Sequence, residues 1–301
     1  MSYILVTGSE GLIGKELVLS LEKLGKSVRH FDIKFPKNHS DYGDILDINC
    51  LRAKLEKCVG IVHLAAVSRV VWGEKDPEHC WQTNVIGTQN IIRAAQNSLL
   101  KPWIVYASSR EVYGAQEKLP VEIDSEYGPV NIYARSKVAA EKEILQARES
   151  QLRTAVVRYS SVYGSVTDHE DRVVPAFCRA AVLGDPLQIE GLDNTLDFTH
   201  VDDSVKGTIE IINALERGEH ALPPMHLTTG VPTTLSKLAE LACKAAGREL
   251  NLVEVPSRSY DVARFWGSTS RTTQILGWSA KIPIEVGVYN LTQQFKLLLK
   301  K

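Results

Sequence analysis

Cysteine is scarce in this 301-residue chain, and the few that occur stand far apart. There are five, an odd number, and no two have C-x-x-C spacing. The sequence therefore excludes a disulfide framework and a cysteine-based zinc site, and we expect packing thiols in a reducing compartment. His63 and His200 have no partner at metal-ligand spacing, so we expect structural histidines and no metal.

An excess of charge of either sign is also absent. Lys and Arg (35) balance Asp and Glu (36), giving a formal net charge of −1, and both signs are scattered. This distribution disfavours a nucleic-acid or anionic membrane partner. No apolar run approaches the ~20 residues of a membrane span, no repeat is visible, and the first residues do not resemble a signal peptide. We expect a cytoplasmic globular protein.

What the first 160 residues do have is an alternation of short β-branched apolar runs with longer amphipathic segments. This alternation predicts a parallel sheet covered by helices, the Rossmann-type doubly wound α/β class. We expect strands at 3–7, 27–32, 60–64, 103–108 and 154–159. We expect helices at 12–24, 50–57, 77–98 and 132–149, the second led by Asp47 and Asn49 as candidate caps.

After Gly164 the alternation fades, and short strands, Pro and Gly become commoner. Further helices are expected near 202–217, 234–246 and 284–299. The sequence thus predicts a first domain over 1–164 and a smaller, mixed α/β C-terminal lobe over 165–301, from which a segment can return to the sheet.

Three glycines, Gly8, Gly11 and Gly14, follow the first expected strand and open the first expected helix. Such glycines allow a tight turn that brings backbone N–H groups against a pyrophosphate. Asp32 closes the next expected strand, where a carboxylate accepts hydrogen bonds from an adenosine ribose and repels a 2′-phosphate. The pattern favours NAD over NADP, although Lys34 and Lys37 offset part of that repulsion.

This glycine spacing resembles that of the extended short-chain dehydrogenases/reductases, which include NAD-dependent nucleotide-sugar epimerases and dehydratases. Segments 63–66 (HLAA), 84–88 (NVIGT) and 276–278 (LGW) resemble further family motifs in the same order. The resemblance implies an NAD-binding first domain and a mainly substrate-binding lobe. The cofactor contacts that it implies are Gly8, Gly11, Leu12, Ile13, Gly14, Asp32, Asp44, Ile45, Leu64, Ala65, Ala66, Ser108, Tyr133 and Lys137.

Tyr133 and Lys137 stand four residues apart, so a helix places both side chains on one face. An ammonium near the phenol, together with the positively charged nicotinamide, favours the phenolate and lowers the Tyr pKa toward that of a general base. The Lys side chain can also hydrogen-bond the nicotinamide ribose. Ser108 and Ser109 end an upstream strand, and the family resemblance assigns Ser109 to the substrate oxygen and Tyr133 to its proton.

Glu111 bears on the subtype of the reaction. In related sugar 4,6-dehydratases and uronic-acid decarboxylases the matching position is a carboxylate, so Glu111 is a candidate catalytic residue and leans toward dehydration. Arg110 stands where dehydratases of deoxythymidine-linked sugars carry an Asp acid, and a guanidinium does not donate a proton near pH 7. A further alternative is that Glu111 and Arg110 only hold a loop through a salt bridge.

The substrate lobe departs from the family pattern at two positions. Ser161 stands where many members have Asn, and Leu196 replaces a phosphate-binding Arg. Arg258 matches a second family Arg that can bind diphosphate in a bidentate way. Either Arg264 or Arg172 is a candidate to compensate for Leu196. Substrate contacts are therefore expected at Arg110, Ser161 and Arg258.

The leading functional hypothesis is an NAD-dependent nucleotide-sugar epimerase, most simply acting at carbon 4 through a transient keto sugar. A 4,6-dehydratase or uronic-acid decarboxylase using Glu111 is the alternative, since both begin with the same oxidation. A keto-sugar reductase and a non-catalytic NAD-binding sensor rank lower, because Asp32 disfavours NADPH and the Tyr–Lys pair is intact. A homodimer is the family expectation.

Overall fold

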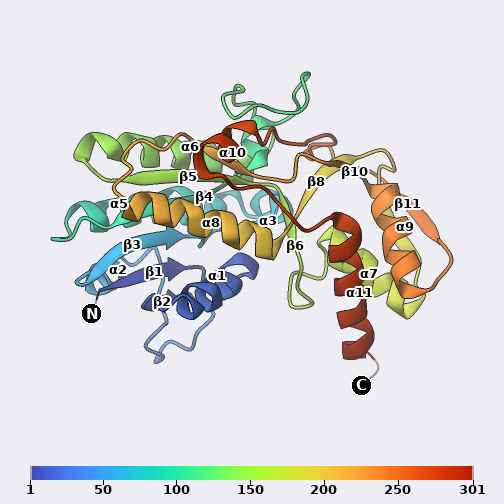
Figure 1. Ribbon diagram of the computed structural model, residues 1–301, viewed down its shortest axis with the longest axis horizontal. Helices are drawn as coiled ribbons and strands as arrows, with labels where there is room; N and C mark the ends of the chain where they lie inside the picture. The colour runs from blue at the N-terminus through green and yellow to red at the C-terminus, as the bar shows by residue number, and fades with distance from the viewer. Residues whose placement is uncertain (1, 300–301) are drawn as a thin grey trace.

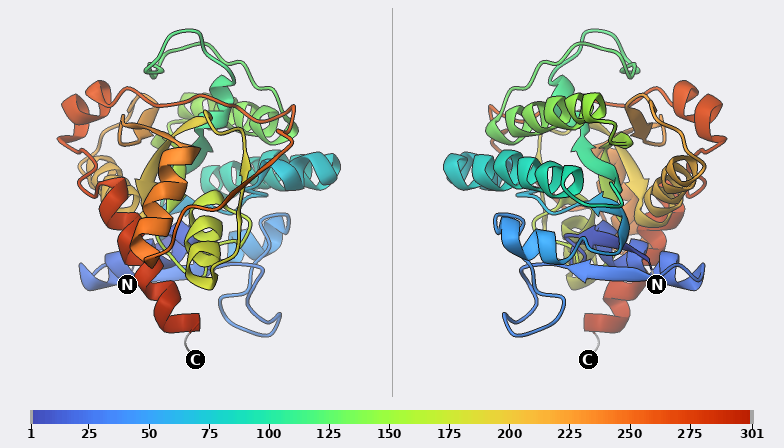
Figure 2. Two further views of the ribbon diagram at one scale, coloured as in Figure 1. Left: turned by 90° about the vertical axis from the view of Figure 1, so that its right-hand side faces the viewer. Right: turned by 90° about the vertical axis from the view of Figure 1, so that its left-hand side faces the viewer.

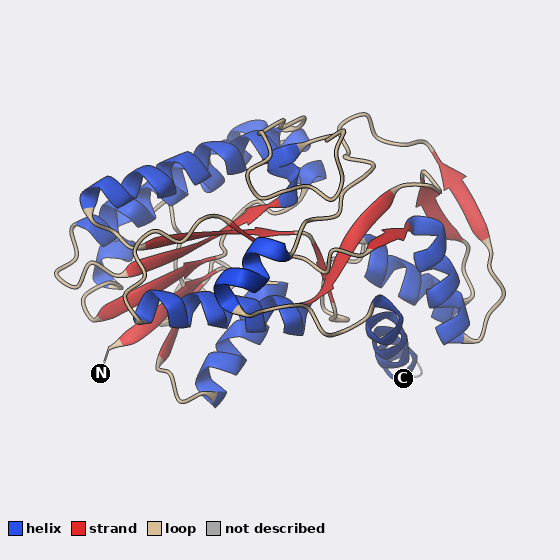
Figure 3. Ribbon diagram, turned by 45° about the horizontal axis from the view of Figure 1, so that its top comes forward, coloured by secondary structure: helices blue, strands red, loops and turns tan. Residues whose placement is uncertain are grey.

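A sheet of six parallel strands organises the molecule (Figures 1 and 3). The computed structural model describes residues 2–299. The order of the sheet is β2-β1-β3-β4-β5-β9, so the direction of winding reverses between β1 and β3. In open sheets of this type, ligands bind outside the carboxyl ends of the strands at such a reversal. The strands are β2 (Val28–Phe31), β1 (Tyr3–Thr7), β3 (Cys58–His63), β4 (Trp103–Ser109), β5 (Thr154–Tyr159) and β9 (Met225–Leu227).

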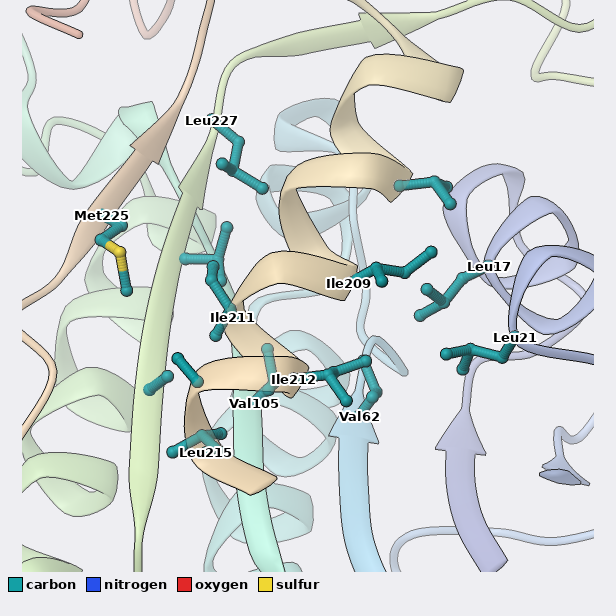
Figure 4. Close-up of a cluster of buried hydrophobic side chains, with 14 of the residues drawn as sticks. Leu17, Leu21, Val62, Val105, Ile209, Ile211, Ile212, Leu215, Met225 and Leu227 are labelled. Atoms are coloured by element: carbon teal, nitrogen blue, oxygen red, sulfur yellow. The ribbon is translucent and has the colours of Figure 1, made fainter. Parts of the chain in front are cut away.

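Helices cover both faces of this sheet (Figure 3). One face carries α1 (Leu12–Lys23) and α8 (Val201–Glu216), and the other carries α2 (Ile48–Ala53), α5 (Gly87–Gln96) and α6 (Ile132–Gln146). Figure 4 shows Leu17 and Ile209, from the two helices of the first face, near Val62 of β3; all three belong to one buried cluster. The doubly wound α/β class predicted from the sequence is confirmed.

The helix expected over 77–98 is interrupted. It consists of α4 (Pro77–Trp81), a π-helical segment (Gln82–Ile86) and then α5. Within the π segment, the Asn84 Oδ1 atom accepts a hydrogen bond from the Val67 N–H at 2.8 Å, and its Nδ2 donates to Ser136 Oγ at 2.9 Å. Single π turns often occur at functional sites. Here the π turn carries a residue that joins the segment after β3 to α6.

The C-terminal lobe contains two small sheets and a group of helices. The larger sheet has the order β10-β8-β6, and β11 pairs in parallel with β7. Beside these sheets α7, α9 and α11 pack together around one apolar cluster (Figure 2). The elements are β6 (Ser161–Tyr163), α7 (Val173–Leu183), β7 (Leu187–Glu190), β8 (Thr195–His200), β10 (Pro232–Thr234), α9 (Leu235–Ala246), β11 (Leu252–Val255) and α11 (Ile284–Leu299).

Segments beyond residue 164 also return to the six-stranded sheet. β9 pairs with β5, and α8 packs against α1. The remaining elements are two short helices, α3 (Val70–Lys75) and α10 (Ser270–Leu276), and two 3-10 turns, Arg110–Tyr113 and Ala147–Ser150. The boundary at 164 stays a prediction. Among residues 2–299, no helix is both long and apolar enough to cross a membrane.

Candidate active site

A cavity of about 710 Å³ lies at the carboxyl ends of β1, β3 and β4 and extends into the C-terminal lobe. It brings together residues that are far apart in the sequence. The candidate site residues that line it are Gly8, Gly11, Leu12, Ile13, Gly14, Leu64, Ala66, Ser108, Ser109, Arg110, Glu111, Tyr133, Lys137, Ser161 and Arg258. This position agrees with the ligand crevice expected at the winding reversal.

The glycine turn after β1 forms one wall of the cavity. Gly8 has φ +70°, and a Cβ atom there would lie 2.6 Å from the Ala65 nitrogen. A Cβ at Gly14 would lie 2.2 Å from the Gly8 oxygen. Larger residues therefore do not fit without backbone movement. The turn leads into the N-terminus of α1, where free N–H groups and the helix dipole attract a phosphate.

Asp32 follows β2 and is buried beside this turn. Its carboxylate accepts hydrogen bonds from the backbone N–H groups of Glu10 at 2.8 Å and Lys34 at 2.9 Å. The Lys34 ammonium turns to the Glu10 carbonyl oxygen at 3.1 Å. Carboxylate oxygens have further lone pairs, so Asp32 can still accept a hydrogen bond from a ribose. The glycine turn and this carboxylate together fit an adenine dinucleotide without a 2′-phosphate.

Four implied cofactor contacts, Asp32, Asp44, Ile45 and Ala65, do not line the cavity itself. Asp44 accepts a hydrogen bond from the Leu46 N–H at 2.9 Å, and Ile45 is buried in the core. Ala65 is in the backbone segment against which Gly8 packs. Their contacts with a cofactor stay predictions.

His63 is a structural residue. Its two ring nitrogens pair with Thr7 Oγ1 at 2.8 Å and Thr88 Oγ1 at 3.0 Å. Burial and the nearby Lys137 ammonium lower its pKa to about 3, so the ring is neutral at physiological pH. Within the described part of the chain, no group of three or more His, Cys, Asp or Glu side chains is arranged to hold a metal ion.

Tyr133 and Lys137 lie on one face of α6, as their spacing predicts, but they make separate contacts. Lys137 Nζ donates to the Ala107 carbonyl oxygen of β4 at 2.7 Å and lies 5.8 Å from the centre of the Tyr133 ring. Burial lowers the pKa of Lys137 to about 8. Burial also raises the pKa of Tyr133 to about 12, although a hydrogen bond with Ser109 opposes the rise. In the chain without a cofactor, burial is thus the largest influence on the phenol pKa and raises it.

Glu111 is held on both of its oxygens. Arg110 Nη2 lies 2.9 Å from Glu111 Oε1, and the Asn131 amide donates to Glu111 Oε2 at 3.2 Å. Asn131 also caps α6, because its Oδ1 accepts from the Ala134 N–H at 2.7 Å. The salt bridge considered from the sequence is thus present, and it joins two residues that line the cavity.

The lobe end of the cavity contains both departures from the family pattern. Ser161, Leu196 and Arg172 line it, whereas Arg264 does not and stacks over Trp266. Arg258 also lines it, with Nε 2.8 Å from Glu190 and 2.9 Å from Asp261. A diphosphate at Arg258 has to compete with those two carboxylates.

Sequence reasoning missed a contact between the two sides of the cavity. Arg69 forms a two-point ion pair with Asp171, in which Nη2 donates to Oδ2 at 2.9 Å. Beside it Trp72 meets His169 edge-on, with ring centres 4.7 Å apart. We call these four residues the clasp. Arg69 and Asp171 both line the cavity, and no local pattern relates residues about 100 positions apart.

Comparisons with known proteins agree with this geometry. The UDP-glucose 4-epimerase of Lactobacillus helveticus is 26% identical over 92% of this chain and 92% of its own length. The UDP-glucuronate 4-epimerase 1 of Arabidopsis thaliana is 27% identical over 95% of this chain and 74% of its length. The structure of a Thermotoga maritima UDP-glucose 4-epimerase with UDP-glucose has a TM-score of 0.90 at 25% identity, covering 99% of each chain.

A Streptomyces venezuelae dTDP-glucose 4,6-dehydratase with bound NAD also has this fold, with a TM-score of 0.89 at 22% identity over 98% of this chain and 97% of that one. The family model named "NAD dependent epimerase/dehydratase family" matches residues 4–222. Its glycine turn and its Tyr133–Lys137 pair line one cavity, and Asp32 lies beside that turn. This chain belongs to the NAD-dependent epimerase/dehydratase family.

Proposed function

We propose that this protein is a nucleotide-sugar 4-epimerase that oxidises carbon 4 of the sugar, rotates the keto sugar and reduces its other face. The observation that carries the proposal is the placement of Ser109, Tyr133 and Lys137 at the end of β4, in the cavity that begins at the glycine turn. The epimerases among the relatives act on UDP-glucose or UDP-glucuronate, which makes a UDP-hexose the first substrate to test.

The residues proposed to hold the cofactor are the glycine turn at the pyrophosphate, Asp32 at the adenosine ribose and Lys137 at the nicotinamide ribose. When bound, NAD supplies reversible acceptance of a hydride. Because Lys137 Nζ already donates to the Ala107 carbonyl oxygen, its side chain is fixed at the end of β4. Two of its three N–H donors remain free for the ribose and for orienting the phenol.

Tyr133 is proposed to move the proton. As the phenolate, Tyr133 takes the proton from the carbinol oxygen during oxidation and, as the phenol, it returns the proton during reduction, while Ser109 hydrogen-bonds the same oxygen. Burial raises the pKa of this phenol to about 12, so Tyr133 is protonated in the chain alone. Phenolate formation therefore requires positive charge close to the phenol. The Arg172 guanidinium lowers the pKa of Tyr133, and the Lys137 ammonium lies 5.8 Å from the centre of its ring.

Glu111 distinguishes epimerisation from dehydration. A dehydratase needs a base for the proton beside the ketone and an acid for the leaving hydroxyl. Glu111 is paired with Arg110 at 2.9 Å, and the guanidinium in the neighbouring position does not donate a proton. This pairing favours epimerisation. Dehydration or decarboxylation through Glu111 remains the second candidate, because the carboxylate is in the cavity.

We further propose a cytoplasmic homodimer. Five free cysteines, four of them buried, suit a reducing compartment. The helices α4, α5 and α6 offer the surface through which a second copy is proposed to pack. Sedimentation at several protein concentrations tests the dimer.

The test of function is turnover of a panel of nucleotide sugars. Purified protein with NAD is incubated with UDP-glucose, UDP-glucuronate and dTDP-glucose. Epimerisation conserves mass and inverts carbon 4, dehydration gives a 4-keto product that has lost water, and decarboxylation releases carbon dioxide. A stable 4-keto-6-deoxy product would reassign the protein to the dehydratases.

A further inference from the structure

A buried guanidinium behind the cavity uses all of its hydrogen-bond donors. The Arg158 side chain on β5 is 3% exposed, and that of Glu141 on α6 is 0% exposed. Arg158 donates to both carboxylate oxygens of Glu141, from Nε at 3.0 Å and from Nη2 at 2.7 Å. Its three other N–H groups reach the Tyr127 hydroxyl at 2.9 Å and, at 2.6 Å each, the Tyr113 hydroxyl and the Ile123 carbonyl oxygen. We call Arg158, Glu141, Tyr113 and Tyr127 the Arg158 hub.

The hub joins the two segments that carry the reacting side chains. Glu141 lies one helical turn beyond Lys137 and two turns beyond Tyr133, so these three residues form one stripe of α6. Tyr113 ends the 3-10 turn Arg110–Tyr113, which begins directly after Ser109. From its position on β5, Arg158 therefore links the turn bearing Glu111, through Tyr113, to the helix bearing Tyr133, through Glu141.

Each partner of Arg158 is itself held in place. The Tyr127 hydroxyl donates to Glu141 Oε2 at 2.7 Å. The Tyr113 hydroxyl pairs with His226 Nε2 at 2.6 Å, while His226 Nδ1 faces the Ser268 carbonyl oxygen at 3.0 Å. Because a carbonyl only accepts, the His226 proton lies on Nδ1 and Tyr113 donates to Nε2. The network leaves the segments little freedom to shift relative to one another.

Stability alone does not explain a buried ion pair. Removing two charges from water is costly, and well-packed apolar residues of similar volume are often equally stabilising. What the pair provides is directional: five hydrogen bonds of fixed geometry define one placement of α6 against the turn. A displacement of about 1 Å at a reacting group can lower a rate by about 100-fold.

We propose that Arg158 and Glu141 are positioning residues that set the register of Tyr133 and Lys137 against Ser109. The proposal rests on the proposed function, because it assigns the purpose of the hub to the reaction. Neither residue lines the cavity, so both act through others. The affinity for the sugar nucleotide depends little on the hub, whereas the chemical step depends on it strongly.

The test is the double substitution Arg158→Met with Glu141→Leu, which removes both charges together and leaves neither ion unpaired. We expect cooperative unfolding to be retained, kcat for epimerisation to fall about 30- to 100-fold, and KM to change less than about threefold. Arg158→Lys supplies three donors in place of five and is expected to retain an intermediate kcat.

Arg148→Met is the matched control. Arg148 follows α6 and joins the far end of that helix to β5 and the nearby chain, donating to Thr154 Oγ1 at 2.9 Å and the Leu222 carbonyl oxygen at 2.6 Å. It has no contact with the turn after Ser109, so its loss is expected to lower stability and leave kcat unchanged. A folded double variant with kcat within twofold of the wild type overturns the proposal, as does an equal loss of kcat in Arg148→Met.

NAD titration makes the test independent of the proposed function. If the wild type turns over no nucleotide sugar, the proposed function fails. The NAD affinity still reports whether Lys137 is correctly placed, because Lys137 is proposed to bind the nicotinamide ribose. We then expect the double variant to bind NAD about tenfold more weakly and Arg148→Met to bind it as the wild type does. Equal NAD affinity in all three proteins overturns the positioning role.

Discussion

Tyr133 and Lys137 have different surroundings although they share a helix face. Burial raises the pKa of the phenol to about 12 and lowers that of the ammonium to about 8. Both shifts favour the neutral form of the side chain, so the chain alone does not hold a phenolate–ammonium pair. The ionised pair becomes favourable only when further positive charge and hydrogen bonds enter the cavity. Under the proposed function, we therefore expect proton abstraction by Tyr133 to depend on ligand binding.

Substitution of Tyr133 by Phe tests its role as the proton-transfer group. We expect turnover to fall by about 10²- to 10⁴-fold, because the ring remains and only the hydroxyl is lost. NAD affinity, measured by fluorescence titration, should stay within about threefold, since Lys137 and the glycine turn are untouched. Tyr3→Phe is the control: this buried hydroxyl donates to the Lys54 carbonyl oxygen at 2.8 Å, far from the cavity. A Tyr133→Phe protein with half of the normal activity would remove Tyr133 from the mechanism.

At the residue scale, the sequence predicts best what depends on local spacing. The Tyr133–Lys137 pair and the three glycines were identified because a helix or a turn relates residues that are near in the chain. Asn131 and Arg172 were not identified as partners of Glu111 and Tyr133. Their importance arises from tertiary placement, since Asn131 reaches Glu111 across 20 positions.

The glycine turn acts as an element rather than as separate residues. Gly14→Ala places a Cβ 2.2 Å from the Gly8 oxygen, so the turn has to open. We expect NAD affinity to fall by about tenfold or more, because the N–H groups no longer converge on a pyrophosphate. Gly25→Ala is the control: its φ of +76° makes alanine strained, but nothing lies within 4 Å of its Cβ. Gly25→Ala should lower stability and leave NAD affinity unchanged. If Gly14→Ala binds NAD as tightly as the wild type does, the glycine turn does not hold the pyrophosphate.

The clasp is expected to retain the keto sugar. Asp171→Ala removes the partner of Arg69, whose own side chain is only 12% exposed, and frees the two sides of the cavity. We expect the first oxidation to keep its rate, while release of keto sugar, with reduced cofactor left behind, rises about tenfold. The absorbance of reduced nicotinamide during turnover measures this release. Glu240→Ala, which breaks the exposed pair with Lys237, is the control. No increase in Asp171→Ala would mean that the clasp does not hold the intermediate.

Elements were predictable where burial gives a clear pattern. The five expected strands of the central sheet lie within two residues of the observed ones. Four of them, β1, β3, β4 and β5, are mostly buried and form apolar runs, whereas β2 is a partly exposed edge strand. α7 was not among the expected helices; it contains Pro175, and a proline in the first helical turn costs no hydrogen bond. The π-helical turn at Gln82–Ile86 depends on the tertiary contacts of Asn84, which no local pattern encodes.

On the scale of the whole molecule, the two sides of the cavity are connected in several places. β9 and α8 return to the central sheet, the clasp crosses the cavity, and His226 of the C-terminal half joins the Arg158 hub. The site is therefore built from both halves of the chain.

Two buried histidines make the stability of the fold sensitive to acid. Burial lowers the pKa of His63 to about 3 and that of His226 to about 4, from an ordinary value of 6.5. Below pH 6.5 the unfolded chain binds protons that the folded chain excludes, so the free energy of unfolding falls as the pH falls toward 4. Each histidine contributes about 1.4 kcal/mol per pH unit in that window.

His226→Gln is therefore expected to reduce the slope of unfolding free energy against pH between 6 and 4.5 by about 1.4 kcal/mol per pH unit, which corresponds to one bound proton. Denaturant unfolding at several pH values measures the slope. Near neutral pH the variant is expected to be less stable, because the Tyr113 hydroxyl loses its acceptor, and this difference narrows as the pH falls. His220→Gln, in the exposed segment after α8, should leave the slope unchanged. If His226→Gln keeps the wild-type slope, acid sensitivity comes from elsewhere, and the neutral histidine inferred from the Tyr113 and Ser268 contacts is wrong.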